Sequence, residues 1–135
     1  MKLTPYLNFA GNAEEALSFY AAVFGGEITM LSRYGVSPMP SDDDWKEKLI
    51  HARLLFEGNL IMLSDSFKGQ PAVGTGNVQL SMEISDAAKI DTIFSALAEG
   101  GTVTMPLQEQ FWGAKFGMLT DKFGISWMFN HELKK

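Results

Sequence analysis

The sequence predicts an α+β fold built from two tandem modules, each with one strand, one helix and three further strands in that order. The main observation is an internal repeat: FGGEITM at residues 24–30 returns as EGGTVTM at residues 99–105. The same interval separates Phe19 from Phe94. A second match, at a shorter interval, relates GNLIMLS from Gly58 to GISWMFN from Gly124. We therefore expect a first module at about residues 1–66, a linker at about 67–76 and a second module at about 77–131.

Length and composition favour one compact domain made of both modules. The 135 residues are 46% apolar, which is enough for a sizeable core. A lone module of about 65 residues would be marginally stable, because small domains bury a smaller share of their surface.

The first module begins with the extended run LTPYLNF and a helix for which Asn12 is a plausible N-cap. Apolar residues recur at helical spacing, so one helix face is predicted to be buried: Ala13, Ala16, Leu17, Tyr20 and Phe24. Gly25 and Gly26 end the helix. A strand follows at 27–34, and LIHARLLFEGNLIMLSD predicts a hairpin that turns at Gly58-Asn59.

The second module repeats this order. VQLSMEIS is the expected opening strand, and Ser85 or Asp86 is the expected helix cap. The buried helix face is predicted to contain Ile90, Ile93, Phe94 and Leu97. Strands are expected near 102–108, 111–120 and 125–130, with DKFG as the last turn.

Charge and residue usage exclude several classes of function. A net charge of −5 argues against a nucleic-acid partner, since phosphate-binding surfaces need clustered Lys and Arg. Without cysteine the chain has no disulfide, thiolate ligand or cysteine nucleophile. No apolar run approaches about 20 residues, and the N-terminus lacks a signal-peptide core, so we expect no membrane partner and a cytoplasmic location.

Several segments together resemble a known superfamily. PYLNFAGNAEEALSFY, IHARL, MLSD and QFWGAKFGMLTDKFGISWMFN are similar to the PhnB-like branch of the vicinal oxygen chelate superfamily, which includes glyoxalase I, bleomycin-resistance proteins and extradiol dioxygenases. The resemblance covers nearly the whole chain. It implies curved mixed sheets around a central cavity, the glyoxalase-like fold.

The resemblance also implies positions for a divalent metal, one in the first and last strand of each module. Here these positions hold Thr4, Met62, Gln79 and Met128, and a shift of one residue would replace Thr4 by Pro5. A thioether is a soft ligand, and one amide cannot replace a quartet of His and Glu. We therefore expect no metal and no other cofactor.

Strand alternation then indicates which side chains line the implied cavity. Pairing across Gly58-Asn59 puts Leu55 opposite Met62 and Arg53 opposite Ser64. The predicted inward set is Thr4, Tyr6, Asn8, His51, Arg53, Leu55, Leu60, Met62, Ser64, Gln79, Ser81, Glu83, Ser126, Met128 and Asn130. Trp127 and Phe129 are expected to face the core. This mixed lining suits a small, partly polar organic ligand.

We select eleven candidate ligand-binding residues: Tyr6, Asn8, His51, Arg53, Met62, Ser64, Gln79, Ser81, Glu83, Trp112 and Met128. His51 or Glu83 would be the general base of any reaction. Structural interpretations stand beside these roles: a hydrogen-bonded His51, an Arg53–Glu83 ion pair, and methionines that only fill space.

Two further groups have alternative interpretations. For Trp112 and Phe116 there are three interpretations: they pack in the core, they contribute to a dimer interface, or they line the pocket. Asp42, Asp43 and Asp44 resemble a magnesium site but are more typical of a solvated acidic run.

The sequence therefore predicts a homodimeric small-molecule-binding protein, with Trp112 near the interface. If the protein is an enzyme, the resemblance implies a lyase, isomerase or dioxygenase. One alternative is a metal-dependent lyase or dioxygenase whose ligands come from His51, Glu83 and His131. A second is a drug-sequestering binder of the bleomycin-resistance type, with an acidic, aromatic groove between subunits.

Overall fold

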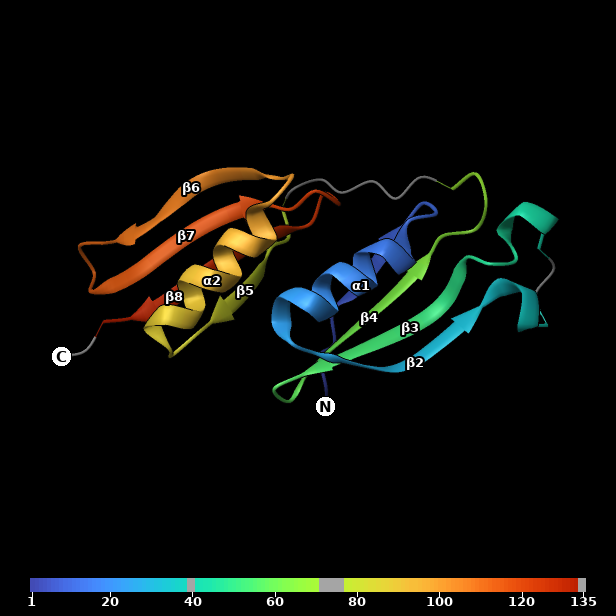
Figure 1. Ribbon diagram of the computed structural model, residues 1–135, viewed down its shortest axis with the longest axis horizontal. Coiled ribbons are helices and arrows are strands. Elements are labelled where there is room, and N and C mark those ends of the chain that lie inside the picture. The colour runs from blue at the N-terminus through green and yellow to red at the C-terminus, as the bar shows by residue number, and fades with distance from the viewer. Residues whose placement is uncertain (39–40, 71–76, 134–135) are drawn as a thin grey trace. The chain divides into compact units, whose positions relative to one another are not determined.

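The computed structural model describes residues 1–38, 41–70 and 77–133. The chain divides into two compact units, Met1–Val73 and Gly74–Lys135, and the division falls within the segment expected to be a linker. Each unit contains one four-stranded mixed sheet and one α-helix (Figure 1). The predicted order of strand, helix and three strands is confirmed in both units. Among the described residues, no helix is long and apolar enough to span a membrane.

The first unit contains β1 (Tyr6–Phe9), α1 (Ala13–Phe24), β2 (Glu27–Arg33), β3 (Leu49–Phe56) and β4 (Asn59–Asp65). Two short 3₁₀ turns, η1 (Tyr34–Val36) and η2 (Asp43–Trp45), lie between β2 and β3. The strand order is β1-β4-β3-β2, with β1 parallel to β4 and the other pairs antiparallel.

The second unit contains β5 (Leu80–Glu83), α2 (Ala87–Ala98), β6 (Thr102–Glu109), β7 (Ala114–Thr120) and β8 (Ser126–Glu132). Its order, β5-β8-β7-β6, has the same topology as the first sheet. Tyr6 pairs with Met62 in the first sheet, and Ser81 pairs with Met128 in the second. The sequence repeat therefore corresponds to equivalent positions in the two sheets.

The two consecutive glycines of the repeat are needed for different structural reasons. Gly25 has a φ of 69° and ends α1 in the left-handed conformation, which glycine adopts without a steric penalty. Gly26 lies so close to β3 that a Cβ would stand 2.9 Å from the Leu54 side chain. Its repeat mate Gly101 is tighter still, because a Cβ there would overlap the Thr120 carbonyl oxygen.

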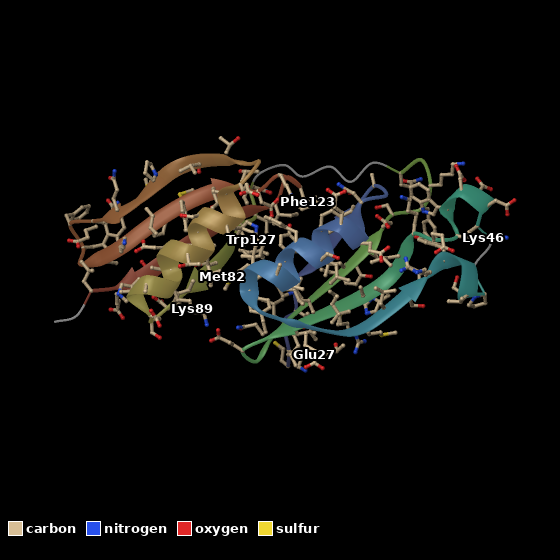
Figure 2. The ribbon with its side chains drawn as sticks, in the orientation of Figure 1. Glu27, Lys46, Met82, Lys89, Phe123 and Trp127 are labelled. Carbon is tan, nitrogen blue, oxygen red and sulfur yellow. The ribbon has the colours of Figure 1, made fainter. Side chains whose placement is uncertain are left out.

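The helix faces pack as predicted. Ala13, Ala16, Leu17, Tyr20 and Phe24 are the buried residues of α1, and Ile90, Ile93, Phe94 and Leu97 are those of α2. Aromatic contacts continue each core into its sheet: Phe24 stacks on Phe56 at 4.5 Å, and Phe94 meets Phe129 edge to face at 5.4 Å. Trp127, labelled in Figure 2, is 1% exposed, which confirms its predicted place in the core.

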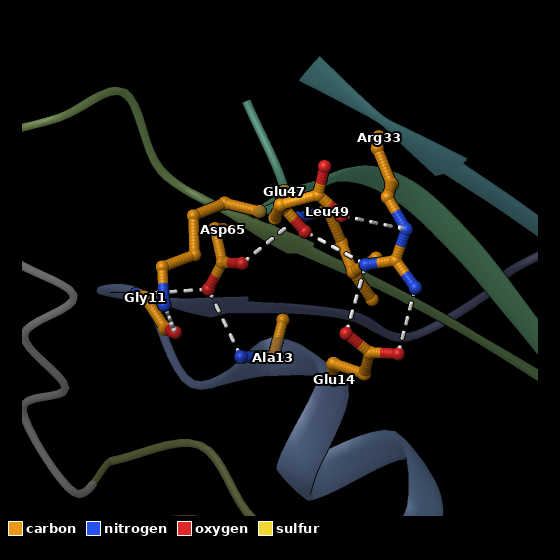
Figure 3. A network of polar contacts seen from close by, with 8 residues as sticks. Gly11, Ala13, Glu14, Arg33, Glu47, Leu49 and Asp65 are labelled. Carbon is orange, nitrogen blue, oxygen red and sulfur yellow. Dashed lines mark hydrogen bonds and ion pairs between the residues drawn. The ribbon is translucent and has the colours of Figure 1, made fainter. Parts of the chain in front are cut away.

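The N-terminus of α1 is capped by a residue distant in sequence. Asn12 occupies the N-cap position but makes no capping bond with its side chain. Instead the carboxylate of Asp65, at the end of β4, accepts hydrogen bonds from the backbone N–H groups of Gly11 and Ala13 at 2.8 and 2.9 Å (Figure 3). In α2 the local prediction is confirmed, because Asp86 accepts from the N–H groups of Ala88 and Lys89.

Two strand predictions need correction. The β3–β4 hairpin turns at Glu57-Gly58, so Leu55 pairs with Leu60 and Arg53 pairs with Met62, two positions from the predicted partners. Since the shift is even, every side chain stays on its predicted face. Strand β7 begins at Ala114 instead of Phe111, and the aromatic pair before it belongs to the turn after β6.

Candidate functional site

Each sheet has one face covered by its helix and one open face. On the first sheet Leu7, Leu54 and Leu63 are buried on the helix side. The opposite side chains form the open face of the first sheet: Tyr6, Asn8, Met30, Ser32, His51, Arg53, Leu55, Leu60, Met62 and Ser64. All predicted inward residues of β1, β3 and β4 are on this face. Thr4 precedes β1 and lies outside the strand.

A continuous chain of hydrogen bonds crosses this face. The Tyr6 hydroxyl oxygen lies 3.1 Å from His51 Nδ1, and the two rings are 5.7 Å apart. On the other side of the imidazole, Arg53 Nε donates to His51 Nε2 at 3.1 Å. Arg53, His51 and Tyr6 therefore form one connected group drawn from two strands, β1 and β3.

The proton positions along this chain follow from its donors. The guanidinium of Arg53 is always protonated, so His51 Nε2 must act as an acceptor. A neutral imidazole carries one N–H, which is then on Nδ1 and is donated to the Tyr6 oxygen. The Tyr6 hydroxyl keeps its own hydrogen to donate elsewhere.

Electrostatics favour the same neutral state of His51. Burial lowers the pKa of His51 below its ordinary value of 6.5, and the charge of Arg53 lowers it further. A protonated ring would direct an Nε2–H at the Arg53 N–H. His51 is therefore held as a neutral donor near neutral pH.

Met62 lies between Tyr6 and Arg53 in the sheet, because it pairs with Tyr6 on one side and with Arg53 on the other. The sequence resemblance implies that Met62 stands at a metal-ligand position of the superfamily. The nearest charged side chain across the ladder is thus a guanidinium, which repels a cation. Pro5, the alternative to Thr4, uses its carbonyl oxygen to accept the Met62 N–H at 3.0 Å.

The remaining polar residues of this face form a second pair. Ser64 Oγ donates to Asn8 Oδ1 at 3.4 Å, which leaves the amide NH₂ of Asn8 as a further donor. Sequence reasoning missed Met30 and Ser32, which lie opposite Arg53 and His51. An antiparallel pairing of β2 with β3 would have placed both residues beside the candidates of β3.

The open face of the second sheet has different chemistry. Ser81, Glu83, Met128 and Asn130 share it, with Met118 opposite Met128. Asn130 Nδ2 donates to Glu83 Oε2 at 2.6 Å, and the hydroxyls of Thr120 and Ser126 are 3.2 Å apart. Gln79 is exposed and immediately precedes β5.

Arg53 and Glu83 each have a partner within their own unit: Arg53 bonds His51, and Glu83 bonds Asn130. His131 follows Asn130 along β8 and so faces the opposite side of the second sheet from Glu83. Its Nδ1 donates to the Ile84 carbonyl oxygen at 2.8 Å, which ties the ends of β5 and β8 together.

The donor groups do not fit the metal expected for the superfamily. The four positions supply two thioethers, one hydroxyl and one amide, whereas hard or borderline divalent cations need carboxylates or imidazoles. Within residues 1–38, 41–70 and 77–133, no three His, Asp or Glu side chains are grouped to hold a metal ion.

The three carboxylates of the acidic run pair with two lysines at the surface. Lys68 pairs with Asp42 at 3.3 Å and with Asp44 at 2.8 Å, and Lys46 pairs with Asp43 at 3.0 Å. All three carboxylates are exposed. These contacts agree with a solvated acidic run.

Aromatic residues gather at the turn between β6 and β7. Phe111 is 96% exposed and Trp112 51% exposed, so the interpretation of Trp112 as a core residue is wrong. Their rings meet edge to face at 5.1 Å, and Trp112 contacts Phe116 in the same way at 5.8 Å. Phe116 lies on the open face of the second sheet, opposite Asn130.

Comparison with known proteins adds the family. Residues 1–129 match the family model described as 3-demethylubiquinone-9 3-methyltransferase. The crystal structure of protein PA1353 from Pseudomonas aeruginosa is 42% identical, with a TM-score of 0.90 and 99% of both chains covered. A Bacillus cereus PhnB protein, described as a 3-demethylubiquinone-9 3-methyltransferase, is 35% identical, with a TM-score of 0.83, covering 97% of this chain and 99% of its own.

A more distant structure shows the wider fold. The glyoxylase/bleomycin resistance protein/dioxygenase domain from Frankia sp. EAN1pec is 15% identical, with a TM-score of 0.70, covering 99% of this chain and 93% of its own. These matches show that the chain belongs to the PhnB-like 3-demethylubiquinone-9 3-methyltransferase family, and its two mixed sheets with their helices have the glyoxalase-like fold.

Proposed function

We propose that this protein binds a small, partly polar organic molecule on the open face of the first sheet. The observation that supports this most directly is the hydrogen-bonded chain of Arg53, His51 and Tyr6, with Met62 paired to Tyr6 and Arg53 in the sheet. Ligand sites combine a mostly apolar surface with a few placed polar groups. Met30, Leu55 and Met62 supply the apolar surface here, and the hydrogen-bonded chain supplies the polar groups.

Further ligand contacts are proposed from the sequence expectations. Asn8 and Ser64 lie on the same face as the chain. Within the second unit taken by itself, the residues that the sequence suggests for ligand binding are Gln79, Ser81, Glu83, Trp112 and Met128. His51 and Glu83 were the candidate bases of any reaction, and we favour Glu83 because His51 Nε2 already accepts from Arg53. Binding is the primary role.

We further propose that the ligand binds without the metal typical of the superfamily, because the donor set is too soft and too uncharged. Elemental analysis of the purified protein tests this point. We expect no stoichiometric Ni, Zn, Fe or Mn. One equivalent that is lost in His51→Ala or Glu83→Ala would favour the metal-dependent lyase or dioxygenase instead.

The family description names methyl transfer, so S-adenosylmethionine belongs in the ligand screen. The screen uses the full chain with ¹³C in the methionine ε-methyl groups and a library of anionic, neutral and cationic fragments. Met62→Leu assigns the Met62 signal. Met82, labelled in Figure 2, points to the helix side of the second sheet and is the control.

Fragments that bind the open face of the first sheet should shift the Met62 methyl signal and leave Met82 unchanged. A screen in which no compound shifts Met62 at millimolar concentration would reject the proposed site. If S-adenosylmethionine were the sole compound to shift it, methyl transfer would replace binding as the working function.

We also propose a homodimer in the cytoplasm. The exposed pair Phe111 and Trp112 supports the assembly, since twofold pairing is the commonest way to bury such a surface. Cell fractionation tests the location.

A further inference from the structure

The groups that the Arg53–His51–Tyr6 chain presents outward are all donors. Tyr6 receives the His51 Nδ1–H and so donates its own hydrogen outward. Arg53 uses Nε for His51, and its terminal NH₂ groups have no other partner among the described residues. Asn8 accepts from Ser64 and presents its NH₂ group.

The open face of the first sheet carries two charged side chains, Arg53 and Glu27. Arg53 carries a full positive charge, and His51 is neutral. The carboxylate of Glu27 lies opposite Leu55, towards the start of β2, and forms no ion pair with Arg53 in the part of the chain that the structure describes. The charge of Arg53 therefore remains available to a ligand.

We propose that the Arg53–His51–Tyr6 chain is a receptor for an anionic oxygen, so that the ligand of this protein carries a carboxylate or a similar oxyanion. Arg53 and the Tyr6 hydroxyl contact that oxygen. His51 is a positioning residue, which orients the Tyr6 hydroxyl by donating to its oxygen. This inference rests on the proposed binding role of the same face.

The pairing of Met62 places the two donors around one point of the sheet. In this chain Met62 is flanked across the ladder by Tyr6 and Arg53. A guanidinium and a hydroxyl attract an anionic oxygen as a cation does, and charge-assisted hydrogen bonds are the stronger kind.

Three probes of nearly equal shape test the charge preference: benzoate, benzamide and benzamidine. Their affinities are measured from the Met62 methyl shift of the full chain at constant ionic strength. We expect benzoate to bind about tenfold or more tightly than benzamide, because hydrogen bonds to charged groups are worth more than neutral ones. Benzamidine should bind most weakly. Equal affinities, or a preference for benzamide or benzamidine, would overturn the proposal.

Substitutions assign the contacts. Arg53→Gln and Tyr6→Phe should each weaken benzoate binding about tenfold and change benzamide binding less. Lys46→Gln is the control, because it removes the same charge from the first unit and lies beyond η2, outside the sheet (Figure 2). Loss of benzoate affinity in Lys46→Gln equal to that in Arg53→Gln would show a general charge effect and overturn the site.

The role of His51 has a readout that needs no ligand. The ¹⁵N shifts of the imidazole should show a protonated Nδ1 and an unprotonated Nε2 at neutral pH. In Arg53→Gln the imidazole should show a mixture of Nδ1-protonated and Nε2-protonated forms, because the donor to Nε2 is lost. A protonated Nε2 in the native protein would overturn the proposed anion site, even if neutral fragments bind to this face. If the expected tautomer is observed but no fragment binds, the proposed binding function is rejected instead.

Discussion

Asp65 holds three segments of the first unit together. Besides Gly11 and Ala13, its carboxylate accepts the N–H of Leu49 at 3.0 Å, and its backbone oxygen accepts the Tyr34 hydroxyl at 2.8 Å. The side chain is 2% exposed. One residue therefore caps α1, fixes the start of β3 and anchors η1. A nearby bidentate pair between Arg33 and Glu14 at 2.8 Å links β2 to the same end of α1 (Figure 3).

Asp65→Ala should strongly destabilise the first unit, because it leaves three backbone donors unpaired. Each buried unsatisfied donor costs about 1–3 kcal/mol, so we expect a loss of at least about 3 kcal/mol. Urea denaturation measures it. Asp43→Ala removes a carboxylate from an exposed ion pair and serves as the control, with no measurable change expected. A loss in Asp65→Ala no larger than in the control would contradict the capping role.

The second prediction at this scale concerns pH. The folded pKa of His51 lies below 6.5, so between the two values the unfolded chain binds more protons than the folded protein. The contribution of His51 to stability is therefore fully present above about pH 6.5 and is lost as pH falls through the folded pKa.

Unfolding in urea at about pH 7.5 and pH 5 should show this loss in the native protein and a smaller one in His51→Gln. Arg53→Gln should raise the pKa of His51, measured by NMR titration. Tyr6 and Arg53 are the titratable side chains bonded to the ring. The same pH dependence in His51→Gln as in the native protein would contradict the assignment.

At the scale of elements, the β3–β4 hairpin shows why strand register was harder to predict than strand face. Alternation in LIHARLLF and NLIMLS determines the faces, whereas the register depends on which two residues turn. Glu57 has a φ of 47° and Gly58 a φ of 80°, and two successive positive angles are characteristic of a type I′ turn. Asparagine is a favoured residue in such turns, but here Asn59 is the first residue of β4. Its side-chain Nδ2 donates to the Phe56 carbonyl oxygen.

This turn gives a matched pair of substitutions. Glu57→Asn should stabilise the protein by about 0.5–1 kcal/mol, because Asn tolerates a positive φ better than Glu. Gly58→Ala should destabilise it by about 1 kcal/mol through backbone strain alone, since a Cβ there would meet nothing within 4 Å. Thermal unfolding of both variants measures the effects. Stabilisation by Gly58→Ala would contradict the turn geometry.

Helix caps show a second limit of sequence reasoning. Ser85 and Asp86 were the two expected caps because they precede α2 directly, and the structure shows that Asp86 is the cap. Asp65 is far from α1 in the chain, and no local pattern relates the two. The equivalent of Asp65 on β8 is His131, which bonds the Ile84 carbonyl oxygen instead. The two copies have therefore diverged in how they begin their helices.

At the scale of the whole molecule, the sequence repeat predicted the architecture and the alternation predicted most face assignments. The hydrogen bonds among Tyr6, His51 and Arg53 could not be predicted, because they depend on side-chain rotamers across two strands. The exposure of Trp112 excludes only the core among its three interpretations, because the residue lies in the turn before β7. Sequence patterns distinguish buried from exposed strand positions, but they do not show which two residues form a turn.

Assembly provides the last prediction. We expect sedimentation at micromolar concentration to give about twice the chain mass of 14.9 kDa, because the aromatic turn would otherwise stay exposed. Phe111→Ser with Trp112→Ser should shift the protein towards the monomer. A native mass near 14.9 kDa would rule the dimer out. A dimer that persists in the double variant would keep the assembly and place its interface elsewhere.

The parallel pairing of β1 with β4 also has a consequence for synthesis on the ribosome. Strand β1 emerges first but has no partner in its sheet until β4 follows, and α1 lacks its cap until Asp65 at the end of β4 appears. The first half of the chain must therefore wait, with its first strand and helix incomplete, until the last residues of that half have left the exit tunnel. Its final strand then completes the sheet and the helix cap in one event, so nascent chains that stall before Asp65 should be far more sensitive to protease than those that stall beyond the linker.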